Sequence, residues 1–154
     1  MSRVQLALNV DNLDQSIAFY AKLFDTEPAK IRPGYANFAV TEPPLKLVLI
    51  ENPGAGGSVN HLGVEVADTD AVDAEQTRLA AAGFASLAER GTTCCYAKQD
   101  KFWVDGAPNG ERWEIYTVLA DSQTFSDAAE TGATCCGTDV SAADQSAQTA
   151  ASCC

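Results

Sequence analysis

Six cysteines stand in the chain as three adjacent pairs, Cys94-Cys95, Cys135-Cys136 and Cys153-Cys154. Neighbouring thiolates are suited to chelating soft metal or metalloid ions, and the Cys-x-x-Cys spacing typical of zinc sites is absent. A secreted disulfide scaffold would spread its cysteines over distant segments, so the pairing indicates a reducing, cytoplasmic environment. For Cys94 and Cys95 two structural alternatives stay open, a redox-active vicinal disulfide and two incidentally buried thiols.

A second set of candidate ligands has nitrogen and oxygen donors. His61 is the only histidine, which excludes a site that needs two histidines from one chain. Its alternative role is that of a buried imidazole hydrogen-bonded to the backbone. Glu114 lies in an apolar segment, where an unpaired carboxylate is costly, so we expect either a metal or a salt bridge to Arg112 or Lys46 to neutralise it.

Hydrophobic periodicity predicts an α+β fold in which these residues lie on strands. Alternation predicts a half-buried strand at 3–10, and apolar residues three and four apart predict a helix over 13–24, with Asn12 and Gln15 resembling a capping box. A second helix is expected from Asp68 or Thr69 to Ala82, ending at Gly83. The remaining strands are predicted at 29–32, 35–40, 45–50, 59–66, 85–90, 101–104 and 112–119.

The order of these elements repeats, which predicts two pseudosymmetric βαβββ modules at about 1–51 and 59–121, joined by a glycine-containing connection to which we assign no chemistry. Aligning 4–10 with 60–66 places Gln5 opposite His61 in the two modules. Residues at matching positions of such modules can converge at a shared sheet. With Glu114 they would form a three-ligand face, similar to an iron site of two histidines and one carboxylate but with an amide in place of one imidazole.

Composition changes after residue 121, since residues 122–154 contain no Lys or Arg, one aromatic residue and four of the six cysteines. We expect a disordered tail whose pairs, Cys135-Cys136 and Cys153-Cys154, scavenge soft ions, so that deleting it would lower binding stoichiometry and spare turnover. A formal net charge of −11 argues against nucleic acid as a partner. No apolar run approaches membrane-spanning length, which predicts a cytoplasmic protein without membrane contact.

Six segments resemble the vicinal-oxygen-chelate superfamily of glyoxalases, dioxygenases and drug-resistance proteins, and within it the ArsI/CadI family. They are 3–10 (RVQLALNV), 33–38 (PGYANF), 43–49 (PPLKLVL), 60–66 (NHLGVEV), 91–95 (GTTCC) and 111–118 (ERWEIYTV). The resemblance covers residues 1 to about 120. It implies a non-heme Fe(II) enzyme that uses molecular oxygen to cleave the carbon–arsenic bond of trivalent organoarsenicals, releasing arsenite. It also implies that homodimers are common among such proteins.

In that reading Gln5, His61 and Glu114 hold Fe(II), and Cys94 and Cys95 bind the arsenic as thiolates. Because adjacent side chains of a straight strand point to opposite faces, chelation requires the backbone to turn near Gly91. Six aromatic residues are candidates for a pocket around the organic group, with core packing as the alternative: Tyr35, Phe38, Tyr96, Phe102, Trp103 and Tyr116.

Two other functions stay open. A Cd(II)- or As(III)-binding sequestration protein would use the thiols alone and would be insensitive to changes at His61 or Glu114. A glyoxalase-like metalloenzyme would use the Gln5, His61 and Glu114 set, although one chain then supplies three of the four ligands usual there.

Overall fold

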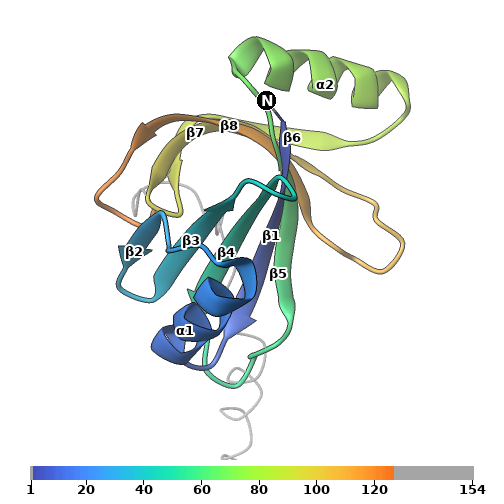
Figure 1. The fold of residues 1–154 in the computed structure, drawn as a ribbon. Helices are drawn as coiled ribbons and strands as arrows, with labels where there is room; N and C mark the ends of the chain where they lie inside the picture. The colour runs from blue at the N-terminus through green and yellow to red at the C-terminus, as the bar shows by residue number, and fades with distance from the viewer. Residues whose placement is uncertain (1, 127–154) are drawn as a thin grey trace, which may run out of the picture.

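The computed structural model describes residues 2–126, which form two consecutive βαβββ modules (Figure 1). The first contains β1 (Arg3–Val10), α1 (Leu13–Phe24), β2 (Lys30–Arg32), β3 (Tyr35–Val40) and β4 (Leu45–Glu51). The second contains β5 (Val59–Glu65), α2 (Thr69–Ala81), β6 (Ser86–Cys94), β7 (Ala97–Val104) and β8 (Trp113–Asp121). The predicted α+β class and the order of elements are confirmed. The cysteines at 135, 136, 153 and 154, and the predicted tail beyond residue 126, lie outside the described residues.

All eight strands form one strongly curled sheet in the order β2-β3-β4-β1-β5-β8-β7-β6 (Figure 1). The modules meet where β1 runs antiparallel to β5, with Leu6 opposite Leu62. On either side of that pair Gln5 faces Gly63 and Ala7 faces His61. This register relates the two strands by a local two-fold axis, so the predicted alignment of Gln5 with His61 is confirmed.

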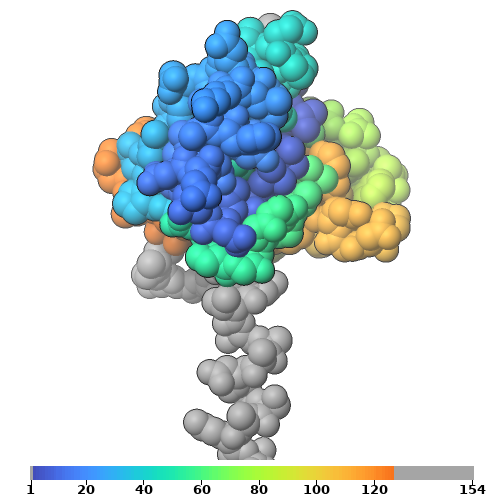
Figure 2. Space-filling view, turned by 60° about the horizontal axis from the view of Figure 1, so that its bottom comes forward, coloured from blue at the N-terminus to red at the C-terminus, as the bar shows by residue number. Residues whose placement is uncertain are grey.

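Each helix covers the convex side of its own half of the sheet (Figure 1). Under α1 lie apolar residues of β3 and β4, among them Phe38, Leu47 and Leu49. Under α2 lie Phe102 and Ile115, with Val72 of the helix itself. Because successive strand residues alternate between faces, this leaves the other set of side chains, including Gln5, His61 and Glu114, on the concave side. The space-filling view shows the first module, in blue and cyan, packed directly against the yellow-green and orange segments of the second (Figure 2).

Local signals in the sequence account for the helix ends. The side chain of Asn12 accepts a hydrogen bond from the backbone of Gln15 at the start of α1. Asp68 caps α2 in the same way through the backbone of Ala71. Gly83 follows the C-terminal cap of α2 with a φ of +87°, a conformation that glycine adopts without strain.

The sequence predicts strands at 85–90 and 101–104 with a loop between them, but the structure has a tight hairpin there. β6 continues to Cys94 and β7 begins at Ala97, so the two strands form a hairpin closed by Cys95 and Tyr96. Both turn residues have positive φ, 54° and 61°, as a two-residue turn with the twist of adjoining strands requires. Sequence rules expect Asn or Gly there, which is why the turn was not predicted. Over residues 2–126, neither helix has the length and apolar character to cross a bilayer.

Candidate metal and thiol site

Gln5, His61 and Glu114 come from three adjacent strands, β1, β5 and β8, and their polar atoms meet on the concave side of the sheet. Gln5 Nε2 lies 3.0 Å from His61 Nε2 and 2.7 Å from Glu114 Oε1, and His61 Nε2 lies 3.3 Å from the same oxygen. Ligands about 2.1 Å from one ion and at right angles to each other lie about 3 Å apart. All three side chains are at most 4 % exposed. The separations therefore fit three ligands of a single ion.

A fully buried lysine sets the charge of this cluster. Lys101 on β7 lies 3.3 Å from Glu114 Oε2 and 3.6 Å from Glu89. Burial alone would raise the pKa of Glu114, but the charge of Lys101, together with the hydrogen bond and charge that His61 supplies when its imidazole is protonated, lowers it to about 2. Glu114 is thus an anion with one oxygen engaged by Lys101 and the other directed at Gln5 and His61.

Glu114 does form a salt bridge, but the partners expected from the sequence, Arg112 and Lys46, are wrong. Lys46 pairs with Glu65 at 3.6 Å, and Arg112 stacks its guanidinium 4.2 Å from the ring centroid of Trp103. Lys101 was missed, because a lysine next to an aromatic strand segment gives no sequence signal of burial. Among the described residues no three His, Cys, Asp or Glu side chains form a metal-binding group, so a site here needs the Gln5 amide as its third donor.

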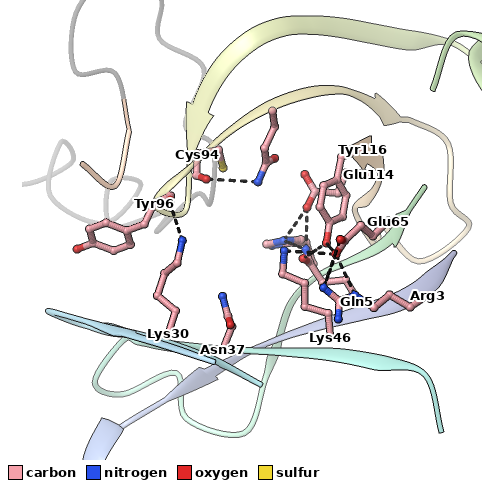
Figure 3. Close-up of polar contacts among 12 residues, drawn as sticks. Arg3, Gln5, Lys30, Asn37, Lys46, Glu65, Cys94, Tyr96, Glu114 and Tyr116 are labelled. Atoms are coloured by element: carbon pink, nitrogen blue, oxygen red, sulfur yellow. Dashed lines mark hydrogen bonds and ion pairs between the residues drawn. The ribbon is translucent and has the colours of Figure 1, made fainter. Parts of the chain in front are cut away.

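The Gln5 carboxamide is held on its other side by Tyr116. The tyrosine hydroxyl donates to Gln5 Oε1 at 2.6 Å and lies 3.1 Å from Glu65, which Arg3 also binds (Figure 3). Burial and the charges of Glu65 and Glu114 raise the pKa of Tyr116 far above its usual range, so it stays a neutral hydroxyl. Because metals bind the amide oxygen, ligation requires the carboxamide to be reversed, and a hydroxyl that both donates and accepts can partner either amide atom.

Gly63 makes room for the cluster and was not singled out from the sequence. A methyl group at this position would lie 3.1 Å from Glu114 Cγ and 3.4 Å from both Cβ and Nε2 of Gln5. The contact with Glu114 is tighter than most side-chain contacts, so Glu114 would have to move by a few tenths of an ångström. A glycine inside a predicted strand is itself a signal of close approach, and here it marks where two candidate ligands converge.

Cys94 and Cys95 lie at the end of the β6–β7 hairpin with their Sγ atoms 3.4 Å apart; Cys94 is a free thiol, whereas Cys95 is disulfide-bonded and would have to be reduced before it could bind an ion. Two sulfurs bound to one ion at about 2.3 Å, at angles between a right angle and the tetrahedral angle, lie roughly 3.3–3.8 Å apart. The left-handed conformations at Cys95 and Tyr96 supply the turn that chelation requires, at a position slightly beyond the expected Gly91. Gln99 donates weakly to the carbonyl of Cys94, and its buried Oε1 has no hydrogen-bond partner among the described residues.

Three groups from elsewhere in the fold hold this turn. Lys30 donates to the carbonyl of Tyr96 at 2.9 Å, and the backbone of Ser122 donates to the same oxygen at 2.9 Å (Figure 3). The hydroxyl of Tyr96 donates to the carbonyl of Pro33 at 3.1 Å. The turn of the second module is therefore fastened to the β2–β3 hairpin of the first.

The cysteine turn and the ligand cluster share one side of the sheet. Cys94 and Tyr96 pack in one apolar cluster with Ala7 and Val48. Ala7 lies two residues beyond Gln5 on β1 and directly opposite His61, so it points to the same face as the ligand cluster. Figure 3 shows Cys94, Gln5 and Glu114 between the strands of the two modules.

The aromatic residues expected to form a pocket separate into two groups. Phe38 and Phe102 belong to the cores under α1 and α2, so their predicted role at the pocket is wrong and the core alternative holds. The other four lie on the concave side. Tyr35 and Tyr96 pack beside Cys94, Trp103 meets the His61 ring edge-on at 5.7 Å, and Tyr116 binds Gln5.

Comparison with known proteins shows the same fold and close relatives. Residues 3–115 match the family described as the Glyoxalase/Bleomycin resistance protein/Dioxygenase superfamily. The cadmium-induced protein CadI of Mycobacterium tuberculosis is 66% identical over 125 residues, which cover 81% of this chain and 82% of the relative. A trivalent organoarsenical cleaving enzyme of Thermomonospora curvata is 56% identical over 137 residues, 88% of this chain and 89% of that protein. The Mn(II)-bound glyoxalase of Novosphingobium aromaticivorans aligns with a TM-score of 0.54 at 21% identity, over 79% of this chain and 42% of that one.

Proposed function

Since this chain belongs to the glyoxalase/bleomycin resistance protein/dioxygenase superfamily, and within it to the family of CadI and the trivalent organoarsenical cleaving enzymes, we propose that it cleaves the carbon–arsenic bond of trivalent organoarsenicals and releases arsenite. The observation that carries the proposal is the presence of two different binding groups on one concave face. A sulfur pair spaced for a soft metalloid faces the same enclosure as a nitrogen and oxygen cluster spaced for a divalent metal.

Cys94 and Cys95 are proposed to bind the substrate. Trivalent arsenic exchanges its two hydroxide ligands for two thiols: each thiol proton goes to a departing hydroxide, which leaves as water, two As–S bonds replace two As–O bonds, and the bond to carbon stays intact. Once Cys95 is reduced, the turn would hold both sulfurs at chelating distance before the arsenical arrives, which reduces the entropy lost on binding. Tyr35 and Tyr96, which pack beside Cys94, supply apolar surface for the organic group.

Gln5, His61 and Glu114 are proposed to hold Fe(II), with the buried anion of Glu114 supplying charge that an amide and an imidazole lack. Three ligands on one side leave the other side of the ion open, and bound Fe(II) would supply the reaction with activated molecular oxygen. The protein's own contribution is to orient the carbon–arsenic bond toward that side and to keep bulk water out. Lys101 keeps Glu114 ionised, and Tyr116 holds Gln5 in place.

The test uses reduced full-length protein loaded with Fe(II) without oxygen, given methylarsenite, and then exposed to oxygen. We expect arsenite to appear after oxygen is admitted. Both His61→Ala and Cys94→Ser are expected to reduce its release at least a hundredfold, the first with arsenical binding retained and the second with Fe(II) retained. The exposed Lys22→Met on α1 is the control. Release that is unaffected by His61→Ala would contradict the proposal.

A second candidate function, soft-ion sequestration without catalysis, is favoured by the sulfur spacing alone. It predicts tight methylarsenite or Cd(II) binding, no arsenite release, and no effect of His61→Ala. The same experiment therefore separates the two functions.

A further inference from the structure

A chain of amide side chains leads from the inter-module connection to the imidazole of His61. His61 Nδ1 lies 2.7 Å from Asn60 Oδ1, Asn60 Nδ2 donates to Asn9 Oδ1 at 3.0 Å, and Asn9 Nδ2 donates to Ser58 Oγ at 2.8 Å. The Ser58 hydroxyl donates in turn to the carbonyl of Ala55 at 2.7 Å. Nothing in the proposed reaction uses these residues.

The carbonyl of Ala55 fixes the direction of every bond in the chain, because a carbonyl only accepts. The single hydroxyl proton of Ser58 goes to that carbonyl, so Ser58 Oγ must accept from Asn9. Asn9 therefore turns its NH₂ to Ser58 and its oxygen to Asn60. Asn60 must then direct its own NH₂ at Asn9 and its oxygen at His61.

An oxygen at this position requires a proton on His61 Nδ1. In a neutral imidazole the other nitrogen, Nε2, then has a lone pair and no proton. Nε2 is the atom that lies 3.0 Å from Gln5 and 3.3 Å from Glu114. We propose that the Ser58–Asn9–Asn60 relay holds His61 in the Nδ1–H form, so that its Nε2 is presented to the metal site as a ready ligand.

The backbone makes the start of the relay rigid. The amide of Asn9 donates to the carbonyl of Ser58 at 2.9 Å, and the amide of Gly57 donates to the carbonyl of Asn9 at 2.9 Å. Asp11 accepts from the amides of Gly54 and Gly56 at 2.7 and 3.1 Å. The connection between the modules, to which the sequence assigned no chemistry, thus anchors the residues that orient a candidate ligand.

The inference rests on the proposed function only where it assigns a metal to His61 Nε2. The tautomer of His61 itself is measured in the metal-free protein. Because His61 is the only histidine, protein labelled with ¹⁵N-histidine gives the signals of one imidazole. Long-range ¹H–¹⁵N correlation of the metal-free full-length chain at about pH 8, above the ordinary histidine pKa, identifies the protonated nitrogen. We expect Nδ1–H alone in the unsubstituted protein.

Two variants break the relay at different points. Asn60→Leu removes the acceptor, and Ser58→Ala, at an exposed position that folding tolerates, removes the group that fixes its direction. In both we expect a measurable Nε2–H population, larger in Asn60→Leu. Asn60→Asp, whose carboxylate only accepts, should restore Nδ1–H. Asn109→Leu, at an exposed asparagine outside the relay, should behave as the unsubstituted protein.

Anaerobic calorimetric titration with Fe(II) gives the functional readout. Loss of a hydrogen-bond partner of a metal-binding histidine weakens metal affinity about 10- to 100-fold, so we expect at least a tenfold increase in the Fe(II) Kd for Asn60→Leu and a near-normal Kd for Asn60→Asp. An Nε2–H imidazole in the unsubstituted protein, or unchanged Nδ1–H in both Asn60→Leu and Ser58→Ala, would overturn the relay. The expected tautomers without Fe(II) binding by any form would support the relay and overturn the proposed metal site.

Discussion

At the scale of single residues, the charge on Glu114 is the feature most sensitive to its surroundings. The side chain is 3 % exposed, so ionisation in this position depends on neighbouring charge rather than on water. Lys101 supplies that charge from a position where it is itself fully buried. Removal of one member of a buried ion pair leaves the other uncompensated, so the two residues must be considered together.

The lowered pKa of Glu114 predicts a specific dependence of stability on pH. A carboxyl whose pKa falls from 4.5 in the unfolded chain to about 2 in the folded one stabilises the protein above pH 4.5, and this contribution is lost as the pH falls toward 2. The shift corresponds to about 3 kcal/mol. We expect the difference in unfolding free energy between the unsubstituted protein and Glu114→Gln to shrink by about that amount between pH 5 and pH 2.

Urea denaturation of the metal-free protein across this pH range measures the difference. Other acidic groups titrate in both proteins and cancel, and Glu27→Gln, at an exposed position, controls for the loss of one negative charge. Parallel stability curves for the unsubstituted protein and Glu114→Gln would show that Glu114 is not an ion in the folded state.

The sequence predicted that Gln5, His61 and Glu114 meet, but it did not predict which residues surround them. Strand periodicity and the internal repeat place Gln5 and His61 at matching positions, which depends only on local pattern. The role of Lys101 follows from the register of β7 on its neighbour β8, which places Trp103 opposite Glu114 and Lys101 opposite Tyr116, and no local pattern encodes that register. Gly63 had a usable signal, a glycine within a strand, that was not used.

At the scale of elements, the β6–β7 hairpin shows why a thiol site is harder to predict. Cys95 and Tyr96 adopt left-handed conformations that cost about 1–2 kcal/mol each for residues with a side chain, so sequence rules favour an open loop. Contacts from β2, the β2–β3 turn and the segment after β8 hold the turn against this cost. Such support comes from distant elements and is visible only in the folded structure.

Lys30 provides a test of this support at a distance from both sulfurs. Lys30→Met removes the donor to the Tyr96 carbonyl and the ion pair with Asp121. We expect methylarsenite affinity to fall about threefold to tenfold, in keeping with the net contribution of one partly exposed hydrogen bond, because the turn then samples geometries with separated sulfurs. Fe(II) affinity should not change.

Anaerobic methylarsenite titration measures the effect in a background in which the four cysteines beyond residue 126 are serine, so that only Cys94 and Cys95 bind. Lys22→Met at the exposed end of α1 is the matched control. Equal affinities for Lys30→Met and Lys22→Met would mean that the turn keeps its geometry without Lys30.

At the scale of the whole molecule, the two modules have diverged around their local two-fold axis. The axis relates Gln5 to His61 and Ala7 to Gly63. Val48 lies beside Ala7 on the adjacent parallel strand, just as Glu114 lies beside Gly63, so the axis also relates Val48 to Glu114. A symmetric arrangement would thus place a second carboxylate where this chain has a valine. That valine packs instead in the apolar cluster that contains Cys94, so the position equivalent to Glu114 lies on the side of the thiol turn.

Truncating the chain at two different points after β8 tests separately the contacts to the thiol turn and the cysteines that follow residue 126. Phe125 packs with its ring centroid 5.6 Å from that of Tyr96, Ser126 bridges to Cys94, and Ser122 binds the Tyr96 carbonyl. A chain ending at residue 126 retains these contacts and loses four cysteines. We expect it to release arsenite at the rate of the full chain while binding fewer Cd(II) ions.

A chain ending at residue 121, the boundary predicted from composition, loses the same cysteines and also the contacts to the turn. We expect its methylarsenite affinity to be about threefold to tenfold below that of the chain ending at 126, since an aromatic contact of this kind contributes about 0.5–1.5 kcal/mol. Arsenite release, Cd(II) stoichiometry and methylarsenite affinity measured on the three lengths separate the two effects. Loss of arsenite release already at the cut after residue 126 would show that the later cysteines take part in turnover, because every described contact to the thiol turn is then still in place.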